Sequence, residues 1–197
     1  MKQNFTQFAF TDSVREEQKK YGSRKSYQRM EENGPDQSHI FQRETAHIEA
    51  MDSFYMSTVG ENGWPYVQFR GGPKGFLKVI DSQTIGYADF RGNMQYISTG
   101  NIKATKKTAL ILLDYPTKTR LKIWAETEIL DPEEHPKLKE QLVLPDYEAK
   151  VERLVIFHLK SFDWNCPQHI TPKYSIEEMK ELMNSDAEFK SYMLNSM

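Results

Sequence analysis

The segment Asp89–Asn101, "DFRGNMQYISTGN", gathers many hydrogen-bonding side chains directly after a predicted strand. Asn93 is of a residue type that caps helices well, so we expect a helical turn from Met94 to about Thr99. The N-terminus of a helix presents backbone N–H groups and a partial positive charge, which together favour a phosphate. This segment is therefore our first candidate for a phosphate-binding site.

Three cations, Arg91, Lys78 and Arg120, can add charge-assisted hydrogen bonds to such a phosphate. The alternative interpretation is structural: Asn93 only caps a short connecting helix, and Arg91 is solvated. The residues by themselves leave both interpretations open.

The familiar motifs of hydrolases and phosphate-binding loops do not occur in this sequence. It has no G-x-S-x-G, no G-x-x-x-x-G-K-[ST] and no G-x-G-x-x-G, and "RGGPKG" (70–75) is more typical of a turn than of a phosphate cradle. The single cysteine, Cys166, is expected to be buried and unreactive rather than a nucleophile paired with His169. We expect no metal site, and name no catalytic residue, because no metal-ligand spacing links the histidines, which are His39, His47, His135, His158 and His169.

Composition narrows the class of protein. The 197 residues are 38% apolar and 27% charged, with a formal net charge of −2, so nothing in the overall charge favours nucleic acid or an anionic membrane. One cysteine excludes a disulfide framework within the chain and fits a reducing compartment. The N-terminus lacks an apolar signal region, and no apolar run approaches the roughly 20 residues that span a bilayer. We therefore expect a cytoplasmic protein with no membrane or nucleic-acid partner.

Helices are predicted towards both ends of the chain. Ser13 and Glu16 form a capping-box pattern that opens a helical stretch to about Glu32, and a short helix is expected over 41–51. Asp131, followed by proline, is expected to open a helix that runs to about Leu142. A second capping box, at 175–178, precedes an apolar stripe formed by Ile176, Met179, Leu182 and Met183.

The middle of the chain has the pattern of strands. Segments 53–59 and 66–72 flank an Asn-Gly turn, and 75–80 pairs with 84–90 as a second hairpin. The run 109–115 is continuously apolar, so both its faces are expected to be covered, while 120–130 alternates and 151–164 is the last long strand. We predict a mainly β fold with flanking helices (α+β), closed or nearly closed as an antiparallel barrel. One domain, 1–197, divides into a helical extension (1–51), a barrel core (52–165) and a C-terminal segment with a helix (166–197).

Four stretches resemble a known family: "WPYVQFRGGPKGFLKVID", "GYADFRGNMQYISTGNI", "RLKIW" and "FDWNCPQHI". In order and spacing they are similar to the pyridoxamine 5′-phosphate oxidase-like flavoproteins, over roughly residues 20–175. The resemblance implies a six-stranded antiparallel split β-barrel. It also implies a homodimer that holds FMN in a cleft between the two subunits.

The resemblance also implies which residues meet the flavin. The backbone of the strand "GFLKVI" would run along the flavin ring, and the end of the next strand would approach the flavin or its ribityl chain. Arg120 stands where the family has a polar flavin contact, and a segment near the C-terminus would reach the flavin from the partner. The residues implied in this way are Gly75, Phe76, Leu77, Lys78, Ala88, Asp89, Arg120, Trp164 and Gln168.

The chain departs from the family pattern at two places. The family's phosphate-binding Arg-Lys pair falls on Met94 and Gln95, so the phosphate would depend on backbone N–H groups, on Asn93 and Gln95, and on Arg91 or Arg120. The Arg-x-His that grips pyridoxamine phosphate is missing, so oxidation of that substrate is not expected.

The function that we expect is an FMN-dependent oxidoreductase acting on an unidentified small molecule, with a nicotinamide nucleotide as a possible reductant. The alternatives are a flavin carrier or sensor without turnover, and a split barrel of the same kind that binds haem or a deazaflavin.

Overall fold

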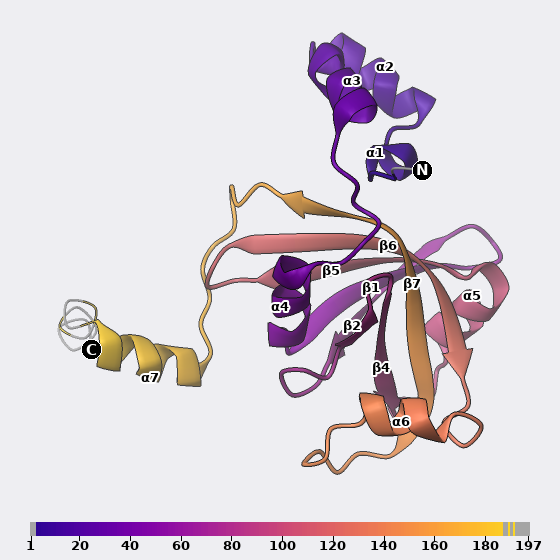
Figure 1. Ribbon diagram of the computed structural model, residues 1–197, viewed down its shortest axis with the longest axis vertical. Helices are drawn as coiled ribbons and strands as arrows, with labels where there is room; N and C mark the ends of the chain where they lie inside the picture. Colours follow the sequence, from indigo (N-terminus) through magenta and orange to yellow (C-terminus); the bar gives the residue numbers. More distant parts are fainter. Residues whose placement is uncertain (1–2, 187–188, 190, 192–197) are drawn as a thin grey trace.

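The computed structural model describes residues 3–186, 189 and 191, so the predicted domain 1–197 extends at both ends beyond the described residues. Seven strands form one antiparallel sheet in the order β2-β1-β5-β6-β7-β4-β3. Their bounds are β1 Ser53–Val59, β2 Pro65–Gly71, β3 Lys78–Asp81, β4 Thr84–Phe90, β5 Lys107–Asp114, β6 Thr119–Leu130 and β7 Val151–Asn165. The sheet curls into a barrel whose edge strands are β2 and β3 (Figure 1).

The helices lie around this sheet. Three of them, α1 (Thr6–Ala9), α2 (Asp12–Lys20) and α3 (Arg24–Asn33), form a group that projects from one end of the barrel, and α6 (Pro136–Leu142) lies at the other end (Figure 1). The remaining helices are α4 (Gln42–Ala50), α5 (Ile97–Thr105) and α7 (Ile176–Ser185). Among the described residues no helix is long and apolar enough to cross a membrane.

The core is built from the inward positions of the alternating strands. In β6 these are Leu121, Ile123, Ala125 and Thr127, all buried, as the period-2 pattern predicts. An aromatic cluster fills the interior, in which Phe54 lies within 6.2 Å, centroid to centroid, of the rings of Phe76, Tyr87 and Phe157. Burial of this apolar interior supplies the main driving force for the fold.

The α+β class and the barrel are confirmed, whereas the count of six strands is wrong. Both hairpins form, and β1 and β2 flank the predicted turn, in which Gly63 has φ 80°. The strand predicted over 75–80 begins only at Lys78, because residues 73–77 form a turn and bend. β5 is covered on one face alone, since Ala109, Ile111 and Leu113 are only half-buried.

Two helix predictions require correction. The helix expected from Ser13 begins at Asp12 and breaks near Gly22, which has φ 77°, so α2 and α3 are separate and the first capping box does not form. The helix expected from Asp131 begins at Pro136, because the Asp131 carboxylate accepts a hydrogen bond from the N–H of Glu133 in a local turn. The second capping box is confirmed: Ser175 Oγ accepts from the N–H of Glu178.

Candidate functional site

The segment that opened the sequence analysis forms one wall of a cavity. The cavity has a volume of about 160 Å³ and lies between β2, the end of β4, β7 and the start of α5. We call it the β2–α5 pocket. Its lining residues are Tyr66, Gln68, Arg70, Phe90, Gly92, Asn93, Met94, Gln95, Tyr96, Ile97, Ser98, Thr99 and Arg153.

Two arginines of this pocket are held by one buried carboxylate. Asp89 is 4% exposed, and its Oδ2 accepts from Arg153 Nε at 2.9 Å and lies 2.8 Å from Arg153 Nη2. Arg70 Nη1 is 3.7 Å from the other oxygen of the same carboxylate. Glu152 pairs with Arg153 at 3.1 Å and with Arg91 at 2.9 Å. Three guanidinium groups thus meet two carboxylates, which leaves a local excess of positive charge beside the pocket.

Three buried polar atoms in and beside this cluster of charges make no hydrogen bond with the described residues. They are Arg70 Nε, the hydroxyl of Tyr87 and Glu152 Oε2, whose only polar contact among those residues is the ion pair with Arg153. Burial raises the pKa of the Tyr87 hydroxyl, which therefore stays protonated and remains a donor. Because Arg70 Nε has no accessible surface, an anion in the pocket would meet Arg70 only through the 20% of its side chain that stays exposed.

The start of α5 lies at the pocket, but three residues later than predicted. The helix begins at Ile97 after Tyr96, which has φ 56°, and Asn93 does not cap it. Instead the Asn93 side chain accepts from the N–H of Gln95 at 3.1 Å. The expectation that Asn93 is the N-cap is wrong for a physical reason: its side chain stabilises its own turn in place of the helix. The first N–H groups of α5 nevertheless have no partner within the helix.

Side chains fix the orientation of this wall. Ser98 Oγ donates to Gln68 Oε1 at 2.8 Å, which ties the first turn of α5 to β2. The guanidinium of Arg153 lies 5.0 Å from the centre of the Tyr96 ring, a cation–π contact. Met94 has φ 59° and is 55% exposed at the rim. Asn93, Met94 and Gln95 therefore lie together, as the sequence predicts, and all three line the pocket.

The three cations proposed from the sequence are occupied elsewhere. Lys78 Nζ donates to the carbonyls of Gln141 at 2.8 Å and Val143 at 3.3 Å, at the end of α6. Arg120 Nη2 donates to the carbonyl of Cys166 at 2.6 Å. Arg91 is paired with Glu152 and does not line the pocket. The cations of the pocket are instead Arg70 and Arg153, which the sequence analysis did not identify.

The residues proposed along the flavin ring are mostly core residues. Phe76, Leu77 and Ala88 are 2%, 0% and 1% exposed, so their side chains point into the protein. Gly75 occupies the preceding turn with φ 82°, a conformation that glycine adopts readily. Any contact from these residues to a ligand would therefore have to come from the backbone, which is how the resemblance described it.

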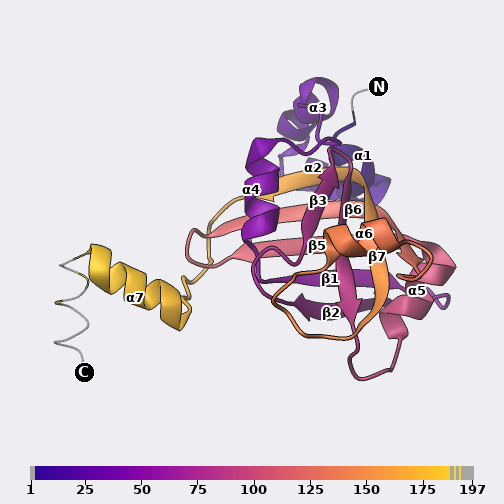
Figure 2. The same cartoon turned by 60° about the horizontal axis from the view of Figure 1, so that its bottom comes forward.

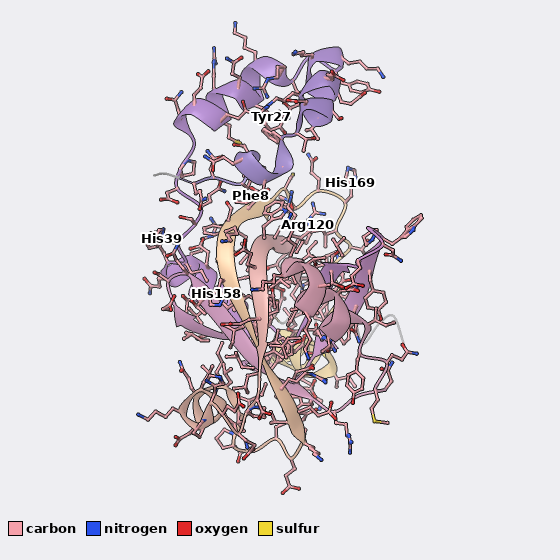
Figure 3. All side chains as sticks on the ribbon, turned by 90° about the vertical axis from the view of Figure 1, so that its right-hand side faces the viewer. Phe8, Tyr27, His39, Arg120, His158 and His169 are labelled. Atoms are coloured by element: carbon pink, nitrogen blue, oxygen red, sulfur yellow. The ribbon has the colours of Figure 1, made fainter. Side chains whose placement is uncertain are left out.

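A second group of predicted residues lies at the far end of the barrel. Trp164 is eleven residues beyond Arg153 on β7, which at about 3.3 Å per residue is roughly 35 Å of strand. Arg120 pairs with Asn165 at that same end, and Figure 3 shows it on the side of the barrel towards the N-terminal helices. Gln168 follows, exposed to solvent. One chain therefore does not bring Trp164, Arg120 and Gln168 together with the β2–α5 pocket.

Trp164 is held by residues of α4. Its Nε1 donates to Glu44 Oε1 at 2.8 Å, and the guanidinium of Arg43 lies 4.2 Å from the centre of its ring. The His47 ring packs edge-on at 4.9 Å, and burial lowers the pKa of His47. These contacts fix the indole against the barrel.

Cys166 is exposed, so the expectation of a buried thiol is wrong. Within the described ranges, 3–186, 189 and 191, no group of three histidines, cysteines or carboxylates is arranged to hold a metal ion.

Comparison with known proteins identifies the relatives of this chain. A family model described as pyridoxamine 5′-phosphate oxidase matches residues 40–160. No curated protein matches the chain. Among solved structures, a Lactobacillus delbrueckii protein with a provisional assignment as a pyridoxamine 5′-phosphate oxidase is 19% identical, with a TM-score of 0.50 over 64% of this chain and 94% of its own.

Two further solved structures have slightly lower TM-scores. Group A Streptococcus HupZ is 16% identical, with a TM-score of 0.49 over 68% of this chain and 99% of its own. An FMN-binding protein from Syntrophomonas wolfei is 18% identical, with a TM-score of 0.47 over 62% and 86%. At such identities the Lactobacillus delbrueckii structure supports the split-barrel fold and nothing finer.

The ion pair below the pocket generates a prediction about stability. Asp89→Asn removes the charge that Arg153 and Arg70 share, so the free energy of unfolding should fall by about 3 kcal/mol. Glu128→Gln is the matched control, because it breaks an exposed pair with His158 and should cost under about 1 kcal/mol. Urea denaturation measures both. Equal losses of unfolding free energy in the two variants would show that the buried pair stabilises the fold no more than the exposed pair does.

Proposed function

The chain belongs to the pyridoxamine 5′-phosphate oxidase family, and on that basis we propose that it is an FMN-binding flavoprotein that acts as an oxidoreductase on a small molecule. A nicotinamide nucleotide is the proposed reductant. Pyridoxamine phosphate is not the proposed substrate, because the sequence lacks the Arg-x-His that grips it.

The observation that supports FMN most directly is the β2–α5 pocket. A phosphate needs several donors and a positive field, and the pocket has Arg70, Arg153, the hydroxyl of Thr99 and the start of α5. The donor set therefore suits the terminal phosphate of FMN.

The protein's own contribution is binding and orientation. When bound, the flavin supplies the redox chemistry, which lies in the cofactor rather than in a side chain. Asp89 positions Arg153 and Arg70, and Ser98 fixes the first turn of α5 against β2. No side chain is assigned as an acid or a base.

We further propose that the site is shared by two copies of the chain. The half-buried face of β5 continues across β1 and β2, where Tyr55, Val67 and Phe69 are 40%, 61% and 57% exposed. A contiguous apolar surface of this kind is typical of an interface. A second copy would also allow its Trp164 end to approach the β2–α5 pocket, which one chain cannot do.

Flavin titration tests the proposal. Apoprotein should take up FMN with quenching of flavin fluorescence and a Kd in the micromolar range or below, and NADPH should reduce the complex faster than it reduces free FMN in stopped-flow experiments. Failure to bind FMN contradicts the proposal. Binding without accelerated reduction would support the carrier or sensor instead, and a haem or deazaflavin spectrum after purification would support those cofactors.

Arg153→Met should weaken FMN binding at least tenfold, because it removes a charge-assisted bond to the phosphate. Riboflavin, which lacks the phosphate, should bind the variant and the parent equally. Arg153→Lys keeps a positive charge beside Asp89, so it should restore part of the affinity for FMN. This variant also controls for a loss of folding in Arg153→Met. Arg29→Met is the matched control, because Arg29 is exposed on α3 and belongs neither to the pocket nor to its cluster of charges. A loss of riboflavin binding equal to that of FMN would place the phosphate elsewhere.

Met94→Arg should tighten FMN binding by about tenfold, because it adds a cation at the rim of the same pocket. The positive φ of Met94 adds no new penalty, since both residues carry a Cβ. Fluorescence titration measures the change, with Met94→Gln as the uncharged control. Unchanged or weaker binding by the arginine variant would argue against a phosphate at this position.

A further inference from the structure

The outer side of β1, β2 and β5 carries an apolar surface that no helix covers within the described residues. Strand alternation places Tyr55, Val67 and Phe69 on this side, and register pairs Tyr55 with both Phe69 and Ile111. The rings of Tyr55 and Phe69 are in contact at 5.7 Å. We call Tyr55, Val67, Phe69, Ala109, Ile111 and Leu113 the outer face.

The helix α7 presents a second apolar surface. Its N-terminus is fixed by a complete capping box at Ser175 and Glu178, so the helix is well defined locally. Ile176, Met179, Leu182 and Met183 form one stripe, in which Ile176 is 70% exposed and the other three are half-buried. Both views show α7 standing away from the barrel (Figures 1 and 2).

Contacts at and just before its first turn place the start of α7 at the margin of the outer face. Glu178 is 3.7 Å from Lys74, and Lys173 lies 4.6 Å from the centre of the Tyr115 ring. Segment 173–175 and Glu178 share a cavity of about 310 Å³ with Leu113 and Ser53, at the margin of the outer face. A second copy that docks on this face would therefore meet α7.

We propose that α7 packs its apolar stripe on the outer face of a second copy of this chain and that the second copy's α7 packs in return on the first. This inference rests on the proposed homodimer and adds α7 to its interface. The exchange is isologous, so a two-fold axis closes it and leaves no free apolar surface for further growth. The partner is a copy of the same chain because the chain itself carries both complementary surfaces.

The available area agrees with such an exchange. At roughly 200 Å² for a large side chain, the exposed parts of Tyr55, Val67 and Phe69 amount to about 300 Å². The stripe of α7 offers a smaller surface, because three of its four members are already half-buried. Two helix-on-face contacts would therefore bury on the order of 1,000 Å², close to the minimum for a specific interface, before any direct contact between barrels is added.

Charge substitutions on α7 test the exchange. Leu182→Lys places a charge in the stripe and should raise the dimer dissociation constant at least tenfold, measured by sedimentation velocity, without lowering the melting temperature of the diluted monomer. Glu181→Lys is the matched control, because position 181 lies on the opposite side of α7. Equal effects of the two variants, or none, would overturn the proposal.

Cross-linking between differently tagged chains tests the geometry. In a Cys166→Ser background, Val67→Cys chains mixed with Met183→Cys chains should be joined by a short bis-maleimide, whereas Glu134→Cys chains near α6 should not be joined to them. A dimer that binds FMN but gives no Val67–Met183 product would contradict the exchange of α7 and leave the proposed function standing. A protein that stays monomeric with FMN bound sinks the shared site as well.

Discussion

The buried carboxylate of Asp89 is the interaction on which the rest of the site depends. β2 is one edge of the sheet and β4 lies next to the other edge, so backbone hydrogen bonds cannot join them. Asp89 joins them through side chains, by holding Arg70 of β2 and Arg153 of β7 on the same carboxylate. The two arginines are thereby fixed side by side, at the end of the barrel where α5 begins.

This arrangement supports the proposal that the pocket binds an anion. A carboxylate buried to 4% exposure needs a cation, and one arginine would neutralise it. The second arginine and the partial positive charge at the start of α5 are not neutralised by Asp89, so the electrostatic potential at the pocket is positive. Glu152 offsets part of this positive charge through its ion pair with Arg153. Because Glu152 also pairs with Arg91, it does not neutralise Arg70 and Arg153 completely.

The strands were predictable because their signals are local. Alternation in β6 and the Asn-Gly turn between β1 and β2 depend on residues a few positions apart. The starts of α5 and α6 were missed for one shared reason: Asn93 and Asp131 each accept a hydrogen bond from the N–H two residues on, so each stabilises a turn where a cap was expected. Sequence pattern alone does not decide between these two uses of the same side chain.

The cations of the pocket were missed because their pairing is long-range. Arg70 precedes two glycines and was interpreted as part of a turn, and Arg153 lies in a strand otherwise identified by its apolar residues. Asp89 is 64 residues from Arg153, and nothing local in the sequence relates them. Sequence pattern placed the segment 93–95 near a helix start, and these three residues line the pocket. The charge that completes the pocket comes from strands that are distant in the sequence, so the pocket exists only where the folded barrel brings β2, β4 and β7 together.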